Sequence, residues 1–204
     1  MELYDSEEQQ VEAIKDWWKE NGKAVIFGAV IGLGGLFGWR YYQDSVVEAR
    51  EAASESYTSV ISALDAKGVA AQSDIQAFID ANKDAEYSVL AAMQLAKAQV
   101  QAGELTAALE QLEWAKSATK DAALEPLLTY RVARIKAEQG EFDAALTDLA
   151  AMTDESWKGR VAELRGDISL RKGDTDAAYS AYTEAQQAVD ASQTLQIKLD
   201  DLAK

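Results

Sequence analysis

The sequence predicts an all-α protein in which a single N-terminal transmembrane helix precedes an α-solenoid of helix–turn–helix repeats. Three observations lead to this prediction. The 204 residues include one Pro and are rich in Ala, Leu, Glu, Gln and Lys, which favour helices. Residues 24–39 form an uncharged apolar run. Three similar hexapeptides, each beginning with Gly and ending in Ala-Ala, recur at regular spacing later in the chain.

The composition excludes several classes of function. The chain has 35 acidic and 20 basic residues, a net charge of −15, whereas a protein that binds nucleic acid needs a basic surface. It has no Cys and no His, which excludes cysteine nucleophiles, disulfides and thiolate or imidazole metal sites. Asp174 and Asp176 resemble the start of a calcium loop, but the required Gly and distal Glu are missing. Since no catalytic motif is present either, we expect neither enzymatic activity nor a cofactor.

The apolar run predicts a transmembrane helix over residues 23–42. Residues 24–39 alone would rise about 24 Å, which is short of a hydrocarbon core of about 30 Å. Aromatic residues extend the run, because Trp17 and Trp39 are separated by about 33 Å of helix and suit the two membrane interfaces. A buried core helix is the alternative, and the aromatic residues and flanking charges make it the weaker one.

The residues around the span predict an uncleaved anchor with a cytoplasmic N-terminus. A signal peptide has a basic start and small residues at its cleavage site, whereas this chain starts with an acidic segment and continues after the run with bulky residues at 39–42. Basic residues are slightly more numerous before the span than after it: Lys15, Lys19 and Lys23 against Arg40 and Arg50. By the positive-inside rule, residues 43–204 then lie across the membrane.

Residues 1–22 predict a short amphipathic helix on the cytoplasmic side. Ser6 and Gln9 have the spacing of a capping box, and one apolar face would carry Val11, Ile14 and Trp18. This helix either lies on the membrane surface or simply continues into the span. The pair Asn21-Gly22 predicts a break between the two.

Small residues within the span predict contact with another transmembrane helix. Ala24, Gly28 and Gly32 recur every four residues, a spacing that lets a second helix approach closely. Gly34 and Gly38 repeat the spacing. Because Gly is common in transmembrane helices, the alternative is a face that contacts lipid alone.

The hexapeptides predict helix–turn–helix repeats. They occupy residues 103–108, 140–145 and 173–178, so their spacings are 37 and 33 residues. The Gly would end a helix A and the next, acidic residue would start a helix B. Twelve residues before the last Ala of each hexapeptide lies a small residue that would let the helices cross closely: Ala96, Ala133 and Gly166. Four residues after the last Ala of each hexapeptide lies a large side chain that would fill the space between units: Leu112, Leu149 and Tyr182.

With this spacing, residues 89–190 resemble three tetratricopeptide repeats, although the aromatic residues usual in helix A are missing. A generic alanine-rich bundle is the alternative. The resulting layout is a repeat domain over 43–204: a degenerate first repeat at 43–84, repeats at about 89–122, 126–156 and 159–190, and a capping helix at 192–203. Ser73 with Gln76 would cap the second helix of the degenerate repeat. The capping helix would close the last apolar face with Leu195, Ile197, Leu199 and Leu202.

The face of helix A predicts a binding groove for an extended peptide. Its inward positions in successive repeats are Leu90, Met93, Lys97 and Val100, then Leu127, Tyr130, Arg134 and Ala137, then Arg160, Glu163, Asp167 and Leu170. The binding residues would be Leu90, Met93, Lys97, Leu127, Tyr130 and Arg134, with Met93 adapting its shape and Tyr130 as a flat anchor. Such repeats clamp a terminal carboxylate with a Lys–Asn pair, and this chain lacks the Asn. The alternative is that these side chains pack against neighbouring helices.

The whole layout is similar to that of the YfgM family, ancillary subunits of the Sec translocon in Gram-negative bacteria. The matching residues are Asn21-Gly22-Lys23, Gly38-Trp39-Arg40-Tyr41, Leu164-Arg165-Gly166 and Lys172-Gly173-Asp174. The resemblance implies a single-pass inner-membrane protein with periplasmic repeats. It further implies as partners the Sec translocon, the membrane-anchored prolyl-isomerase-type chaperone PpiD and secreted client proteins that pass to periplasmic chaperones. A cytoplasmic role in restraining an envelope-stress response regulator is also implied.

A structural scaffold tethered to the membrane, serving a cell-envelope assembly complex, is the alternative function. A groove that handles many clients should carry adaptable apolar side chains, whereas a dedicated scaffold can be polar and fixed.

Overall fold

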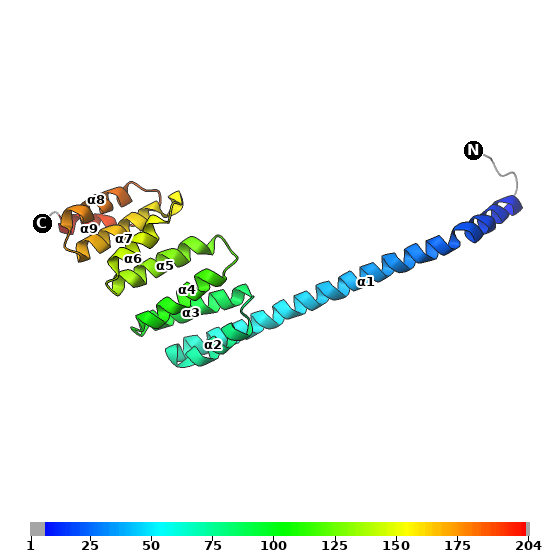
Figure 1. Cartoon of the computed structure of the whole chain (residues 1–204), viewed down its shortest axis with the longest axis horizontal. Helices are drawn as coiled ribbons and strands as arrows, with labels where there is room; N and C mark the ends of the chain where they lie inside the picture. The colour runs from blue at the N-terminus through cyan, green and yellow to red at the C-terminus, as the bar shows by residue number, and fades with distance from the viewer. Residues whose placement is uncertain (1–6, 203–204) are drawn as a thin grey trace. The chain divides into compact units, whose positions relative to one another are not determined.

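The computed structural model describes residues 7–202, and all regular structure within them is helical, which confirms the all-α prediction (Figure 1). The chain divides into two compact units, Met1–Ala52 and Ala53–Lys204. Helix α1 (Glu7–Lys67) contains the apolar run, and the helices that follow it belong to the second unit.

The apolar part of α1 is exposed. Phe27, Leu36 and Trp39 are 70%, 60% and 63% exposed. Among the described residues, one helical stretch is long and apolar enough to cross a membrane, and almost none of its most apolar window is buried. Because a soluble protein would bury such a surface, the alternative of a core helix does not apply to this segment.

The predicted break at Asn21-Gly22 is wrong, since α1 is helical through both residues. Local contacts explain the difference. The Asn21 side-chain amide donates to the Trp17 carbonyl one turn earlier, at 3.1 Å. Gly22 is buried beneath the Trp18 indole. Both residues therefore have partners in the helical state. The capping box predicted at Ser6 and Gln9 lies partly outside the described residues.

The second unit begins with the last turns of α1 and with α2 (Gln72–Ala81), joined by the 3-10 turn η1 (Gly68–Ala71). Tyr57 of α1 packs against Phe78 of α2, with ring centroids 6.3 Å apart. The predicted cap by Ser73 and Gln76 is wrong. The chain enters α2 directly from η1, so Ser73 lies inside the helix and Gln76 instead accepts a bond from the Gln111 amide at 2.9 Å.

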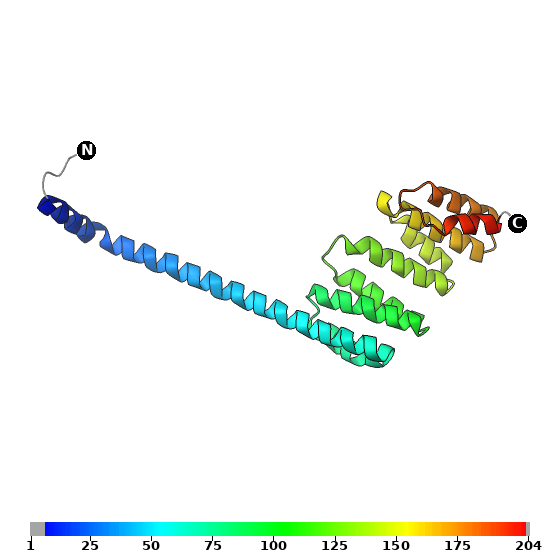
Figure 2. The same ribbon diagram turned by 180° about the vertical axis from the view of Figure 1, so that it is seen from behind.

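The remaining helices pack in chain order, each beside the next (Figures 1 and 2). They form three helix pairs and a terminal helix: α3 (Glu86–Gln101) with α4 (Leu105–Ala118), α5 (Leu124–Glu138) with α6 (Phe142–Ala150), α7 (Lys158–Arg171) with α8 (Thr175–Gln186), and α9 (Leu195–Leu202). A 3-10 turn, η2 (Glu155–Trp157), precedes α7.

The three turns within the pairs share one hydrogen-bond pattern. Gly103, Gly140 and Gly173 have φ of 80°, 83° and 83°, in the left-handed region that favours glycine. After the first of them, the Glu104 amide donates to the Gln99 carbonyl at 2.8 Å, and the other two turns repeat this bond. The following acid is the N-cap in each case, but only the Asp174 side chain accepts a bond from the helix, from the Ala177 amide at 2.9 Å.

Small residues lie where the paired helices cross. Ala96, Ala133 and Gly166 are buried, and so are the facing residues Ala108, Ala145 and Ala178. The third pair differs from the other two, because the large residue after the crossing is Tyr182 rather than Leu. A Cβ at Gly166 would overlap the Tyr182 ring, so Gly at 166 is the partner of Tyr at 182.

The apolar core consists of three clusters along the solenoid. The first extends from the end of α1 to α5, the second joins α5 and α6 to α7, and the third joins α7 and α8 to α9. In α9, Leu195 and Leu199 are buried, whereas Ile197, predicted to close the last face, is 62% exposed. Residues 195 and 199 are one helical turn apart, and residue 197 lies on the opposite side.

We predict that Gly166→Ala lowers the free energy of unfolding by about 1–3 kcal/mol, because the added methyl group forces the Tyr182 ring to move. In a Tyr182→Leu background, which recreates the Ala/Leu combination of the other two pairs, the same change should cost about 1 kcal/mol less. Chemical unfolding of the purified full chain, followed by circular dichroism, measures both. Equal costs in the two backgrounds would contradict the steric explanation.

Candidate functional site

The structure forms an open cleft between the first two complete repeats, which we call the α3–α5 cleft. It has a volume of about 480 Å³. Its floor is apolar and comes from α3, α4 and α5: Met93, Ala96, Val100, Leu105, Leu112 and Ile135. Its rim is polar: Gln94, Lys97, Gln101, Arg131, Arg134 and Glu138. A cleft of this kind suits an apolar side chain that carries polar groups beside it.

The cations on this rim are not neutralised by an acid among residues 7–202. Among the described residues, the side chains of Lys97, Arg131 and Arg134 make no hydrogen bond and no ion pair. The acid on the rim is already paired, because Glu138 lies 3.2 Å from the Arg171 guanidinium. The rim therefore carries uncompensated positive charge.

A second hollow lies between the second and third repeats, and we call it the α5–α7 hollow. Leu127, Tyr130 and Trp157 line it, together with Arg131, Arg134, Arg160 and Glu163. The Tyr130 and Trp157 rings pack with centroids 5.6 Å apart, and the Arg160 guanidinium lies 4.9 Å from the Trp157 ring centre. Burial raises the pKa of Tyr130, so the phenol stays neutral at physiological pH.

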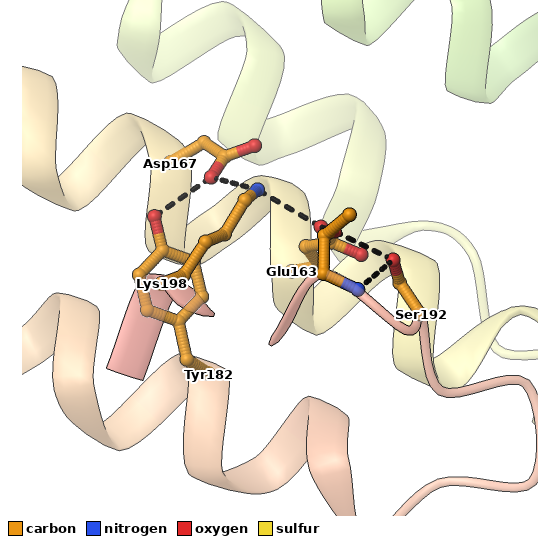
Figure 3. Close-up of polar contacts among 6 residues, drawn as sticks. Glu163, Asp167, Tyr182, Ser192 and Lys198 are labelled. Carbon is orange, nitrogen blue, oxygen red and sulfur yellow. Dashed lines mark hydrogen bonds and ion pairs between the residues drawn. The ribbon is translucent and has the colours of Figure 1, made fainter. Parts of the chain in front are cut away.

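The inward face of the third repeat is held by the C-terminal segment (Figure 3). Lys198 of α9 donates to Asp167 at 2.6 Å and lies 2.9 Å from Glu163. The Tyr182 hydroxyl donates to the same Asp167 oxygen at 2.7 Å. Burial alone would lower the pKa of Lys198, but its bonds to the two carboxylates outweigh that effect and raise it. One lysine of the same chain thus pairs with both acids on this face.

The structure divides the residues predicted to line the groove. Met93, Lys97, Val100 and Arg134 lie together at the α3–α5 cleft, and Leu127, Tyr130, Arg134, Arg160 and Glu163 lie at the α5–α7 hollow. Leu90 lines neither and is half-buried against the core. Met93 is only 7% exposed, so it belongs to the core as well as to the cleft floor.

Three other predicted groove positions do not line either hollow. Ala137 is buried in the core, Asp167 is bonded to Tyr182 and Lys198, and Leu170 is exposed. Sequence reasoning missed Arg131 and Trp157. The spacing of Arg131 from Arg134, three residues, places both on one helix face and was the available signal. Trp157 lies in a turn, outside any helical register.

The small residues predicted to contact another transmembrane helix lie on an open surface. A Cβ built at Gly28 or Gly32 would meet nothing within 4 Å, and Ala24 is exposed. The face that carries Ala24, Gly28 and Gly32 is therefore accessible to a partner helix or to lipid.

Paired helices with close small-residue crossings, stacked in chain order, define an α-solenoid of the tetratricopeptide class. The sequence profile of a tetratricopeptide repeat-like domain family matches residues 15–204. The fold is also similar to the crystal structure of MamA, with a TM-score of 0.55 over 79% of this chain and 88% of that one at 16% identity. These matches favour tetratricopeptide-like repeats over a generic bundle.

Three curated relatives are each described as an ancillary SecYEG translocon subunit. The protein from Escherichia coli is 35% identical over the full length of both chains. The protein from Haemophilus influenzae is 35% identical over 89% of each chain. The protein from Aggregatibacter actinomycetemcomitans is 33% identical over 96% of this chain and 97% of its own. This chain belongs to the family of ancillary SecYEG translocon subunits, a non-enzymatic family with tetratricopeptide-like repeats.

We predict that the contact of Tyr182 with Asp167 makes stability sensitive to alkaline pH. Burial and then the bond to Asp167 raise the pKa of Tyr182 above its ordinary value of 10.0. A group whose pKa is raised on folding stabilises the folded state fully below its unfolded pKa, and this contribution is lost as the pH rises through the folded pKa. The midpoint of thermal unfolding should therefore fall less steeply above about pH 10 in Tyr182→Phe than in the wild type.

The comparison isolates the hydroxyl, because Tyr182→Phe keeps the ring against Gly166 and leaves the Lys198–Asp167 pair in both proteins. Thermal unfolding of the full chain measured between about pH 8 and pH 11 tests the prediction. Parallel curves for the two proteins would contradict it.

Proposed function

We propose that this chain associates with a SecYEG translocon in the inner membrane and that its helix A face receives secreted proteins before they pass to periplasmic chaperones. The observation that carries the proposal is the α3–α5 cleft, an open apolar floor on a protein whose relatives are translocon subunits. An open apolar floor, on which Val100 is exposed, suits segments of varied sequence and favours this role over that of a fixed scaffold.

The proposal includes an orientation. Residues 1–22 lie in the cytoplasm, residues 23–42 span the membrane and residues 43–204 lie in the periplasm. The exposed apolar surface of the span and the Lys residues that precede it support this arrangement. This orientation assigns the partners implied by the family resemblance to the two sides of the membrane. A membrane-anchored chaperone of the PpiD type would bind on the periplasmic side, and the cytoplasmic segment would restrain an envelope-stress response regulator.

We predict that a photo-crosslinking amino acid at Val100 captures secreted chains in membranes that are exporting protein. Val100 lines the cleft and is 42% exposed, so the substitution keeps the core intact. Met93 is unsuitable, because a buried position would report on folding. The measurement is the yield of crosslinks to a radiolabelled secreted protein.

Tyr179 is the matched control position, because it is 52% exposed on α8 and lines neither the cleft nor the hollow. Equal yields at Val100 and Tyr179 would contradict a client site in the cleft. Protease added to spheroplasts tests the orientation in the same strain, since digestion of the repeats is expected only if they are periplasmic.

We predict that Gly28→Leu with Gly32→Leu reduces co-purification with SecYEG about tenfold, because bulky side chains would separate helices whose pairing contributes about 1–2 kcal/mol. The matched control is Ile26→Phe with Val30→Phe, which adds bulk on the opposite side of the helix at exposed residues. Gly28 and Gly32 have no neighbour within 4 Å, so the test pair leaves the chain itself undisturbed. Co-purification of the Gly28→Leu, Gly32→Leu variant at the wild-type level would contradict the prediction and indicate that this face contacts lipid alone.

A further inference from the structure

We propose that the α3–α5 cleft selects extended segments that carry acidic side chains next to an apolar residue. The apolar residue enters the cleft, and its neighbouring carboxylates pair with Lys97, Arg131 and Arg134 on the rim. This inference rests on the proposed function, to which it adds the chemistry of the segment that is bound.

The first observation is that three basic side chains without an ionic partner gather at this one cleft, whereas several others in the repeats are paired. Arg165, Arg171, Lys136 and Lys172 each lie within 4 Å of a carboxylate, at Glu184, Glu138, Asp148 and Asp143. In contrast, Lys97, Arg131 and Arg134 have no ionic partner among residues 7–202, although the protein carries 15 more acids than bases. These three cations therefore lack an internal ionic partner among residues 7–202 despite the large excess of acidic residues.

The second observation is that the acids lining the α3–α5 cleft and the α5–α7 hollow already have partners. Glu138 pairs with Arg171, and Glu163 pairs with Lys198. Asp190, in the α5–α7 hollow, accepts bonds from the backbone amides of Gly159 at 2.7 Å and Arg160 at 3.1 Å. Because these acids are occupied, the exposed cations of the cleft face water and salt ions, which the carboxylates of a ligand can replace.

The third observation concerns geometry. Lys97 is on α3 and the two Arg residues are on α5, so cations lie on both walls of the cleft with the apolar floor between them. A planar guanidinium binds a carboxylate through two parallel hydrogen bonds. Acidic side chains on either side of an apolar anchor would therefore reach cations while the anchor contacts Val100 and Leu112 on the floor.

The occupant is a segment of another protein, identified by its charge. Basic segments would be repelled by the rim, and neutral ones would gain only the apolar contact. The partner carboxylates belong to Asp and Glu side chains, because the cleft lacks the Asn that completes a clamp for a chain terminus.

The experiment measures binding of fluorescent peptides to the full chain in nanodiscs by fluorescence anisotropy. The probe is a C-terminally amidated peptide, Glu-Asp-Leu-Trp-Glu-Asp, and its controls replace the acids by Gln and Asn or by Lys. A free-acid version distinguishes side-chain carboxylates from a terminal one. Since exposed ion pairs are individually weak and three cations lie at the cleft, we expect the acidic probe to bind about tenfold more tightly than the neutral one, with an advantage that declines in salt.

The protein variant is Arg131→Gln with Arg134→Gln, which should remove that advantage. Both side chains are exposed and make no internal bond, so the fold should be retained, and Lys97→Gln provides an independent test on the other wall. The matched control is Lys116→Gln with Lys120→Gln, which removes the same charge away from the cleft. It should bind like the wild type.

Equal affinity for the acidic and neutral probes would overturn the inference, and so would equal losses in the cleft variant and its control. Stronger binding of the free acid alone would reassign the cations to a chain terminus and also overturn it. In each of these cases, crosslinks from Val100 to secreted chains would leave the proposed function standing. If Val100 captures no secreted chain while the acidic probe still binds, the proposed function fails and the chemistry of the cleft stands.

Discussion

The close crossing of the paired helices is the constraint on which the repeat unit depends. Small residues at 96 and 108, 133 and 145, and 166 and 178 let the two backbones approach. A glycine in the left-handed conformation then reverses the chain, with the same bond pattern in all three pairs. Because the crossings and turns repeat, α3 and α5 present equivalent positions to one cleft.

The third repeat keeps this constraint with a different pair of residues. Tyr182 replaces the Leu of the first two pairs, and Gly166 replaces their Ala, so that the ring fits against the backbone. The Tyr hydroxyl then reaches Asp167, and Lys198 from α9 joins the same carboxylate (Figure 3). The smaller residue at 166 and the larger one at 182 thus provide a hydroxyl that bonds to Asp167 beside Lys198 of the C-terminal helix. The cleft between the first two repeats, in contrast, is open.

The repeats differ in how their basic side chains are paired. Most of the basic side chains in the third repeat are paired, whereas those at the rim of the α3–α5 cleft are free of internal partners among the described residues. In the first unit, the apolar side chains of α1 are largely exposed. Each feature leaves a surface whose complement lies outside the chain: lipid or another helix for α1, and an acidic segment for the cleft.

The sequence by itself determined the helical class, the membrane segment and the repeat register. These depend on local periodicity, on an uncharged run of sufficient length and on residues whose backbone preference is strong, such as the Gly of each turn. Part of the candidate site followed from register counting as well, because equivalent positions in stacked repeats face the same side. Lys97, Val100 and Arg134 are residues of that kind.

Only the tertiary structure decided the rest. Asn21-Gly22 and Ser73 carry local signals for a break and a cap, but a helix with favourable contacts overrides such weak preferences. Met93 is buried by residues distant in the sequence. Asp167 likewise accepts its hydrogen bonds from the distant residues Tyr182 and Lys198. Side-chain partners across repeats do not follow from periodicity, since register gives the face on which a residue lies and packing alone determines what covers it.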